Sequence, residues 1–191
     1  MSTDTVLAPP PVGVATGATV WLTGLPSAGK TTLATALAER LRAESRAVEV
    51  LDGDVVRAAL SPDLGYSRAD RDANVARIGW VAERLASHGV LVIAAVISPF
   101  AAARDAVRAA HETRAVPFLE VHVATPAQVC AERDVKGFYA RQRDGAMSGL
   151  TGVDGEYEPP PTPELRLDTN GRSVDDAVDE LIALLRKENL S

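Results

Sequence analysis

The chain has 191 residues, of which 46% are hydrophobic and 24% are charged, and it carries a formal net charge of -6 at pH 7. These values are typical of a soluble globular protein, and the acidic balance argues against nucleic acid and against an anionic membrane as partners. The single cysteine, Cys130, cannot form an internal disulfide, which fits the reducing cytoplasm.

The first segment, residues 1–17, contains three consecutive prolines and no lysine or arginine. A secretory signal needs a basic start and a longer apolar run, and no apolar stretch in this sequence is long enough to cross a bilayer. We therefore expect a flexible arm over 1–17, followed by one compact cytoplasmic domain over 18–191.

The apolar run 19–23 predicts a strand, and residues 30–44 predict a helix because leucines recur there at helical spacing. Between them, residues 24–32 read Gly-Leu-Pro-Ser-Ala-Gly-Lys-Thr-Thr, which is a phosphate-binding loop in its required context. Its backbone amides and the helix N-terminus would surround the phosphates of a nucleoside triphosphate. Lys30 would reach the β- and γ-phosphates, and the Thr31 hydroxyl would ligate Mg²⁺.

Residues 47–51 predict a second strand, which leads through Asp52-Gly53-Asp54 into a short helix over 55–60. Ligands collect at the carboxyl ends of strands in open α/β sheets, so both carboxylates should face the same crevice as the phosphate-binding loop. A kinase needs one carboxylate near the acceptor hydroxyl and another group near Mg²⁺, and Asp54 and Asp52 would supply them. Asp54 is also a suitable N-cap for the helix, and the two roles are compatible.

The next predicted helix, 69–88, and the loop before it carry a cluster of basic, aromatic and amide side chains. Its members are Tyr66, Arg68, Arg71, Asn74 and Arg77, together with Arg57 of the preceding short helix. The last three recur every third residue and so lie along one helix face. Such a face suits an anionic planar ligand, because guanidinium groups bind phosphate or sulfate and a ring stacks on a base. The alternative is a solvated face paired with Asp70 and Asp72, and the spacing does not decide between the two.

Residues 90–97 are apolar without alternation, which predicts a strand buried on both faces. Ser98 and Pro99 follow, and then a helix over 100–112. These two residues would start that helix as N-cap and N1, or the serine would contact the acceptor at the strand's end. The strand is not followed by acidic residues, and the sequence has no Asn-Lys-x-Asp, which favours a small-metabolite kinase over a GTPase or a mechanical ATPase.

Strands over 117–124 and 164–168 and helices over 126–134 and 174–187 complete a regular alternation, which predicts an α/β fold with a mainly parallel central sheet. The segment 135–163 is rich in Gly, Pro, Arg and Asp and has little apolar periodicity. We interpret it as a lid, with a solvated surface loop as the alternative. The basic residues available to phosphates there are Arg133, Lys136, Arg141 and Arg143.

These separated motifs resemble those of the adenylylsulfate kinase (APS kinase) family, from Val20 to Leu185. The phosphate-binding loop is widely shared, whereas the other motifs in this order are specific. They are 51–54 with Arg57, 64–67, 70–71 with Asn74 and Arg77, 97–100, 133–139 and 149–154. The resemblance implies a three-layer P-loop kinase fold with a lid insertion, usually dimeric, that acts in sulfate assimilation alongside an ATP sulfurylase.

Members of this family use MgATP to phosphorylate the 3′-hydroxyl of adenosine 5′-phosphosulfate. By resemblance, Asp54 is the base for that hydroxyl, and Lys30 and Ser98 share the catalytic positions with it. No phosphoserine is required, because phosphoryl transfer proceeds in line between positioned groups. ATP would be held by Ser27, Ala28, Gly29, Lys30, Thr31 and Thr32. The acceptor would be held by Asp54, Arg57, Tyr66, Arg71, Asn74, Ile97, Ser98, Lys136, Gly149 and Leu150.

Two departures from the family pattern affect the adenine pocket. Tyr66 stands where Phe is usual, and Leu150 replaces the usual lid Phe, so one aromatic face would be lost. Two other functions remain open at this point: a kinase for another small acceptor, and a nucleotide-binding regulator without catalysis.

Overall fold

The computed structural model describes residues 16–190. The arm predicted over 1–17 therefore lies outside the described residues except for its last two positions. None of the described helices is both long enough and apolar enough to cross a membrane.

A five-stranded sheet forms the centre of the structure, with the strand order β2-β3-β1-β4-β5. Every neighbouring pair in it is parallel, which confirms the predicted α/β class with a mainly parallel sheet. Parallel neighbours need crossover connections, and helices supply them here. The strands are β1 (Ala18–Thr23), β2 (Val48–Asp52), β3 (Leu91–Ala95), β4 (Phe118–Val123) and β5 (Leu165–Leu167).

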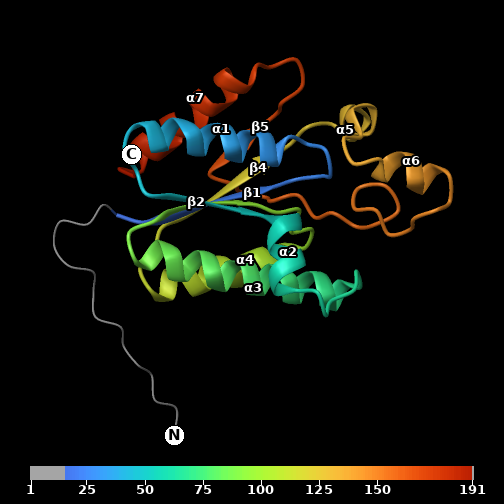
Figure 1. The fold of residues 1–191 in the computed structure, drawn as a ribbon, viewed down its shortest axis with the longest axis horizontal. Helices are drawn as coiled ribbons and strands as arrows, with labels where there is room; N and C mark the ends of the chain where they lie inside the picture. Colours follow the sequence, from blue (N-terminus) through green and yellow to red (C-terminus); the bar gives the residue numbers. More distant parts are fainter. Residues whose placement is uncertain (1–15, 191) are drawn as a thin grey trace, which may run out of the picture.

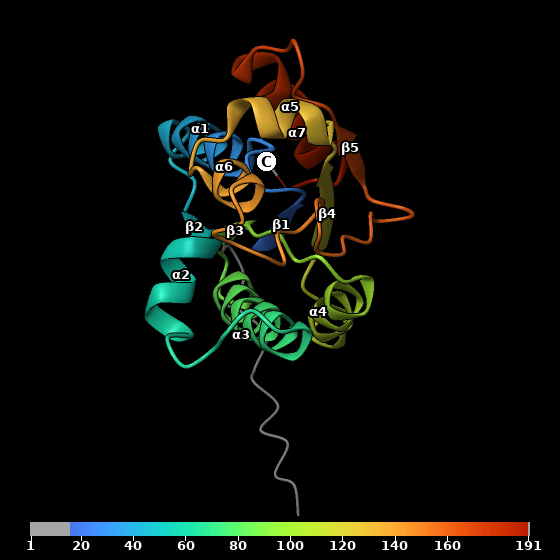
Figure 2. The same ribbon diagram turned by 90° about the vertical axis from the view of Figure 1, so that its right-hand side faces the viewer.

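Helices cover both faces of the sheet and give the predicted three layers (Figures 1 and 2). Helices α1 (Lys30–Ala43) and α7 (Val174–Lys187) pack together on one face, and α3 (Arg68–Ser87) and α4 (Ala101–Thr113) pack together on the other. The three short helices lie toward the carboxyl ends of the strands (Figure 1). They are α2 (Gly53–Leu60), α5 (Ala127–Arg133) and α6 (Phe138–Arg143).

Strand β1 illustrates how the sequence specifies these layers. Successive side chains of a strand point to opposite faces. Val20 and Leu22 therefore join the apolar cluster of α1 and α7, whereas Trp21 joins the cluster of α3 and α4. All three are at most 1% exposed. The phosphate-binding loop thus follows the central strand of the sheet, all six residues of which are buried.

The predicted helices and strands agree with the structure to within two residues at each end. Helix α6 was not predicted, because its six residues within the lid are too few to show a periodic pattern. Asp134 holds its start by accepting the backbone N–H groups of Tyr139 and Ala140. Strand β3 ends earlier than predicted, and Ser98 then redirects the chain with a φ of 40°.

Two predicted helix caps are wrong. Ser98 does not cap α4. The helix begins at Ala101, and the backbone N–H of Ala101 donates to the carboxylate of Glu158 at 2.7 Å. Asp54 does not cap α2, because the cap is Asp52, whose side chain accepts the backbone N–H of Asp54. The second correction frees the Asp54 side chain from any capping role.

Candidate active site

A cavity of about 780 Å³ opens at the carboxyl ends of β1, β2 and β3. The phosphate-binding loop forms one wall, and side chains from α2 and α3 form another. It brings together most of the residues that the sequence predicts for the site. These are Ser27, Ala28, Gly29, Lys30, Thr31, Thr32, Asp52, Asp54, Arg57, Tyr66, Arg71, Asn74, Ile97, Ser98 and Lys136.

The phosphate-binding loop has the backbone conformation that its glycines permit. Gly29 has a φ of +103° immediately before α1, a region that side chains with a Cβ rarely adopt. A Cβ on Gly24 would meet the carbonyl oxygen of Val123 at 2.4 Å, so only glycine fits where the loop leaves the sheet. The first amides of α1 and its dipole therefore face the cavity.

Lys30 is 8% exposed and is folded along its own loop. Its ammonium donates to the carbonyl oxygens of Gly24 at 2.9 Å and Leu25 at 2.7 Å. Burial lowers the pKa of Lys30 from 10.5 to about 7, because a charged ammonium loses its hydration there. An anionic ligand would reverse this effect by supplying the opposite charge.

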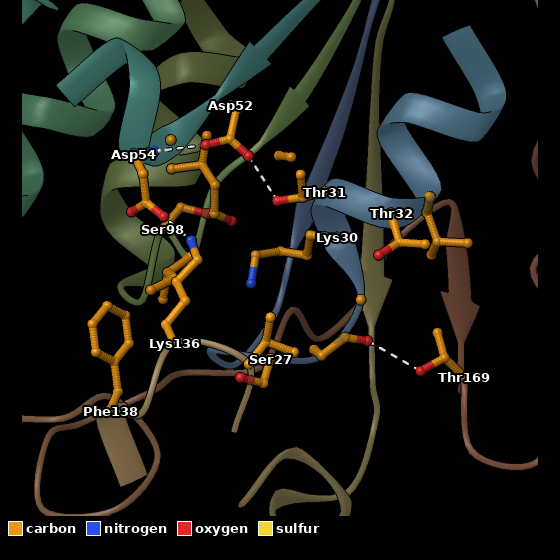
Figure 3. A pocket seen from close by; sticks show the side chains of 18 of the residues that line it. Ser27, Lys30, Thr31, Thr32, Asp52, Asp54, Ser98, Lys136, Phe138 and Thr169 are labelled. Atoms are coloured by element: carbon orange, nitrogen blue, oxygen red, sulfur yellow. Dashed lines mark hydrogen bonds and ion pairs between the residues drawn. The ribbon is translucent and has the colours of Figure 1, made fainter. Parts of the chain in front are cut away.

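Thr31 and Asp52 form a pair of oxygen ligands beside Lys30. The Thr31 hydroxyl donates to Asp52 Oδ2 at 2.7 Å, while Oδ1 of the same carboxylate caps α2 (Figure 3). Mg²⁺ prefers hard oxygen donors and is bound through one or two carboxylates together with substrate phosphates. The donor set at this point fits that ion.

Asp54 projects into the cavity from the first turn of α2 and forms an ion pair with Lys136 of the lid (Figure 3). The side chains of Asp54 and Lys136 are 60% and 48% exposed. The lid therefore reaches across the cavity mouth and places its lysine against the carboxylate predicted to act as the base.

The second wall consists of Arg57, Tyr66 and Asn74. We call it the acceptor wall, after the role that the sequence predicts for these residues. The Arg57 guanidinium lies 4.5 Å from the centre of the Tyr66 ring, and that ring is 72% exposed at the cavity edge. Asn74 is only 6% exposed, and its side-chain oxygen has no hydrogen-bond partner within residues 16–190. A buried amide oxygen without a partner is costly in a folded protein, so a ligand donor is expected at Asn74.

Arg71 connects the acceptor wall to the lid. It donates to the Thr151 hydroxyl at 2.9 Å and to the Gly149 carbonyl at 2.8 Å. Gly149 and Leu150 do not line the cavity, and Leu150 is buried in the apolar core. Arg77 points elsewhere and forms two bonds of 2.6 and 2.8 Å with Asp63.

Ser98 is 1% exposed, and its hydroxyl is engaged inside the protein. The hydroxyl accepts from Trp21 Nε1 and donates to the Thr23 hydroxyl, each at 3.0 Å. In this structure Ser98 therefore shapes the cavity wall through its backbone, and its hydroxyl is not available to a ligand.

A third wall, which the sequence did not predict apart from Arg133, comes from the lid and from the turn between β5 and α7. It comprises Val135, Phe138, Thr169, Arg172, Ser173, Val174 and Ala177 together with Arg133. Thr169 joins this wall to the phosphate-binding loop by donating to the Ala28 carbonyl at 3.1 Å (Figure 3). The polar turn after the last predicted strand could have indicated this wall, because the carboxyl ends of parallel strands lie at the same edge of a sheet.

Phe138 bears on the prediction that the replacement of the usual lid Phe by Leu150 removes one aromatic face from the adenine pocket. Its ring lies at the cavity beside Lys136 (Figure 3). The cavity therefore has an aromatic residue besides Tyr66, from a different part of the lid than Leu150.

The low pKa of Lys30 predicts that a triphosphate binds together with a proton. At pH 8 the amine should be mostly neutral in the free protein, and phosphate oxygens beside it should raise its pKa again. We expect uptake of about one proton per bound ATP at pH 8. Calorimetric titrations in two buffers with different ionisation enthalpies measure this uptake. Lys30→Met should abolish it, and uptake that persisted in this variant would assign the proton to another group.

The family model described as adenylylsulphate kinase matches residues 16–168. An adenylyl-sulfate kinase of Synechococcus sp. (strain JA-3-3Ab) is 49% identical over 170 residues, or 89% of this chain and 94% of the relative. The Mycobacterium tuberculosis APS kinase CysC in complex with AMPPNP and APS matches with a TM-score of 0.87 and 42% identity, over 90% of this chain and 99% of that chain.

A hexameric APS kinase from Thiobacillus denitrificans matches with a TM-score of 0.69 and 39% identity, over 91% of this chain and 29% of that chain. The predicted P-loop kinase fold is confirmed by these structures. With a family match over most of its length and relatives near half identity, the chain belongs to the adenylylsulphate kinase family.

Proposed function

We propose that this chain transfers the γ-phosphoryl group of ATP to the 3′-hydroxyl of adenosine 5′-phosphosulfate, giving ADP and 3′-phosphoadenylylsulfate. Family membership supports the reaction. The observation that carries it in the structure is the shared cavity, in which Lys30 and the acceptor wall face one space with Asp54 at its edge. In-line phosphoryl transfer requires the donor and acceptor sites to meet in this way.

The donor site would use groups that already line the cavity. Phosphates of ATP would lie against the amides of the phosphate-binding loop, and Lys30 would exchange its two carbonyl partners for phosphate oxygens. Thr31 and Asp52 would hold Mg²⁺, which neutralises charge on the phosphates when it is bound. The purine would rest on the third wall, against Arg133, Thr169 and Val174.

The acceptor site would use the remaining groups. Asp54 would accept or orient the proton of the 3′-hydroxyl. Arg57 would bind the phosphosulfate and Tyr66 would stack on the adenine, while the unpaired Asn74 oxygen would accept a hydrogen bond from the ligand. Lys136 would leave Asp54 for the anionic substrate, so that the same movement frees the base and brings a positive charge to the acceptor.

The direct test is release of ADP by purified protein supplied with MgATP and adenosine 5′-phosphosulfate, with chromatographic identification of the product. We expect ADP and the 3′-phosphorylated product in equal amounts. Turnover of another acceptor with adenosine 5′-phosphosulfate inert would replace the proposal by a different small-molecule kinase. MgATP binding without turnover of any acceptor would point to a regulator instead.

We further propose that the enzyme works in the cytoplasm as a homodimer and receives its acceptor from an ATP sulfurylase. The buried free thiol of Cys130 supports a reducing compartment. Sedimentation of the purified protein tests the oligomeric state.

A further inference from the structure

A buried guanidinium lies behind the acceptor site without lining the cavity. Arg104 of α4 is 2% exposed and donates to three acceptors from separate segments. These are the Ser98 carbonyl at 2.8 Å, the Glu120 carboxylate of β4 at 2.6 Å and the Glu158 carbonyl at 2.8 Å. One side chain therefore joins the turn after β3, strand β4 and the C-terminal end of the lid.

The Ser98 turn needs external support. A φ of 40° places this non-glycine residue in the left-handed region, a conformation that persists only where surrounding contacts impose it. Arg104 holds the carbonyl of Ser98, and Trp21 and Thr23 hold its hydroxyl. This turn carries Ile97 and Ser98 past the acceptor side of the cavity.

The lid ends against the same turn. The Glu158 backbone N–H donates to the Pro99 carbonyl at 2.8 Å, and the Glu158 carboxylate accepts the first N–H of α4. Tyr157 lies within 3.2 Å of the Thr23 hydroxyl. Arg104 adds a buried link between the two segments, because it binds the carbonyls of both Ser98 and Glu158.

We propose that Arg104, with Glu120 as its counter-ion, is a positioning residue for acceptor binding. It fixes the Ser98 turn and the C-terminal end of the lid in one geometry, so that the acceptor site is formed before the acceptor arrives. The inference rests on the proposed function, because it assigns Arg104 to the acceptor half of that reaction.

A role in stability alone does not account for this arrangement. Burying an ion pair costs solvation energy, and apolar side chains of similar volume often stabilise a core as well or better. A guanidinium differs from them in offering several donors in a fixed plane. Arg104 uses that property to hold two backbone carbonyls at the boundary of the cavity and the lid.

Arg108 provides a matched control one helical turn further along α4. It pairs with Glu164 at 2.8 Å and lies 3.6 Å from the carboxylate of Glu120, the partner of Arg104. Within residues 16–190, its hydrogen bonds and ion pairs go to Phe118, Glu120 and Glu164 and not to Ser98 or Glu158. Arg108 therefore shares the helix and the counter-ion of Arg104 but not its contacts with the acceptor side.

The test compares Arg104→Lys with Arg108→Lys in steady-state kinetics. Lysine keeps the charge beside Glu120, but one ammonium on a flexible stem does not hold three acceptors in plane. We expect the KM for adenosine 5′-phosphosulfate to rise about tenfold in R104K, which corresponds to a loss of about 1.4 kcal/mol in acceptor binding. The KM for ATP should stay within about twofold, and R108K should change neither. Equal changes in both KM values would overturn the proposal.

A second measurement does not depend on the identity of the acceptor. Arg141 and Arg143 of the lid are exposed sites for trypsin. Releasing the lid end from Arg104 should accelerate cleavage there in R104K and not in R108K, as followed by mass spectrometry. If R104K does not fold, Glu120→Gln replaces it in both assays with the same expected direction. Wild-type protein inactive on adenosine 5′-phosphosulfate would refute the proposed function, whereas unchanged lid cleavage in R104K would refute the positioning role.

Discussion

Replacing Asp54 by asparagine is expected to lower kcat by about 10²–10⁴-fold, the usual loss when a positioned general base is removed. Asparagine keeps the shape of the side chain but does not accept the proton of the acceptor hydroxyl. The fold should tolerate the change, because Asp52 and not Asp54 caps α2. Steady-state kinetics with both substrates measure the effect, and the affinity for ATP should be almost unchanged.

The substitution also breaks the ion pair between Asp54 and Lys136, so its control must break a comparable pair elsewhere. Asp63→Asn does this, since Asp63 pairs with Arg77 at 2.6 Å and lies outside the cavity. Exposed pairs of this kind contribute about 0–1 kcal/mol to stability. Both variants should therefore melt close to the wild type, and only D54N should lose turnover. A D54N enzyme with kcat near that of wild type would remove Asp54 from the mechanism and revive the alternative of a regulator.

The sheet and the donor site were predictable because their signals are local in the sequence. The phosphate-binding loop is contiguous, and each buried strand is a short apolar run bounded by polar residues. Because ligands bind at the carboxyl ends of parallel strands, Asp52 and Asp54 could be placed near Lys30 without any knowledge of tertiary contacts. The structure has all three at one cavity.

The parts that escaped prediction depend on contacts between distant segments. The carboxylate of Glu158 accepts the first backbone N–H of α4, although Glu158 is 57 residues away from Ala101 in the sequence. No local sequence pattern could therefore identify it as the cap in place of Ser98. The third wall needs the turn after β5 to return beside the phosphate-binding loop. The spacing of Arg71, Asn74 and Arg77 was ambiguous for a similar reason, since only tertiary structure shows that Arg77 turns away to Asp63.

Lys30→Met is the second substitution expected to have a large effect. Groups that stabilise charge developing in a transition state contribute about 10²–10³-fold to kcat in other enzymes, and Lys30 is the lysine of the phosphate-binding loop. We expect a loss of at least this size in kcat/KM for ATP. Lys187→Met, the same replacement at a lysine of α7 whose side chain is 76% exposed, should leave the kinetics unchanged.

The same variant separates loss of chemistry from loss of structure through the pH dependence of stability. In the unfolded chain Lys30 keeps its proton up to about pH 10.5, whereas burial lowers the folded pKa to about 7. Between these values the unfolded state binds more protons, so this group makes the ligand-free protein more stable as pH rises. Denaturant unfolding at pH 7 and pH 9 should show the rise in wild type and K187M and a smaller one in K30M. An equal rise in K30M would mean that Lys30 is charged in the free enzyme, and its catalytic role would then have to rest on the kinetics alone.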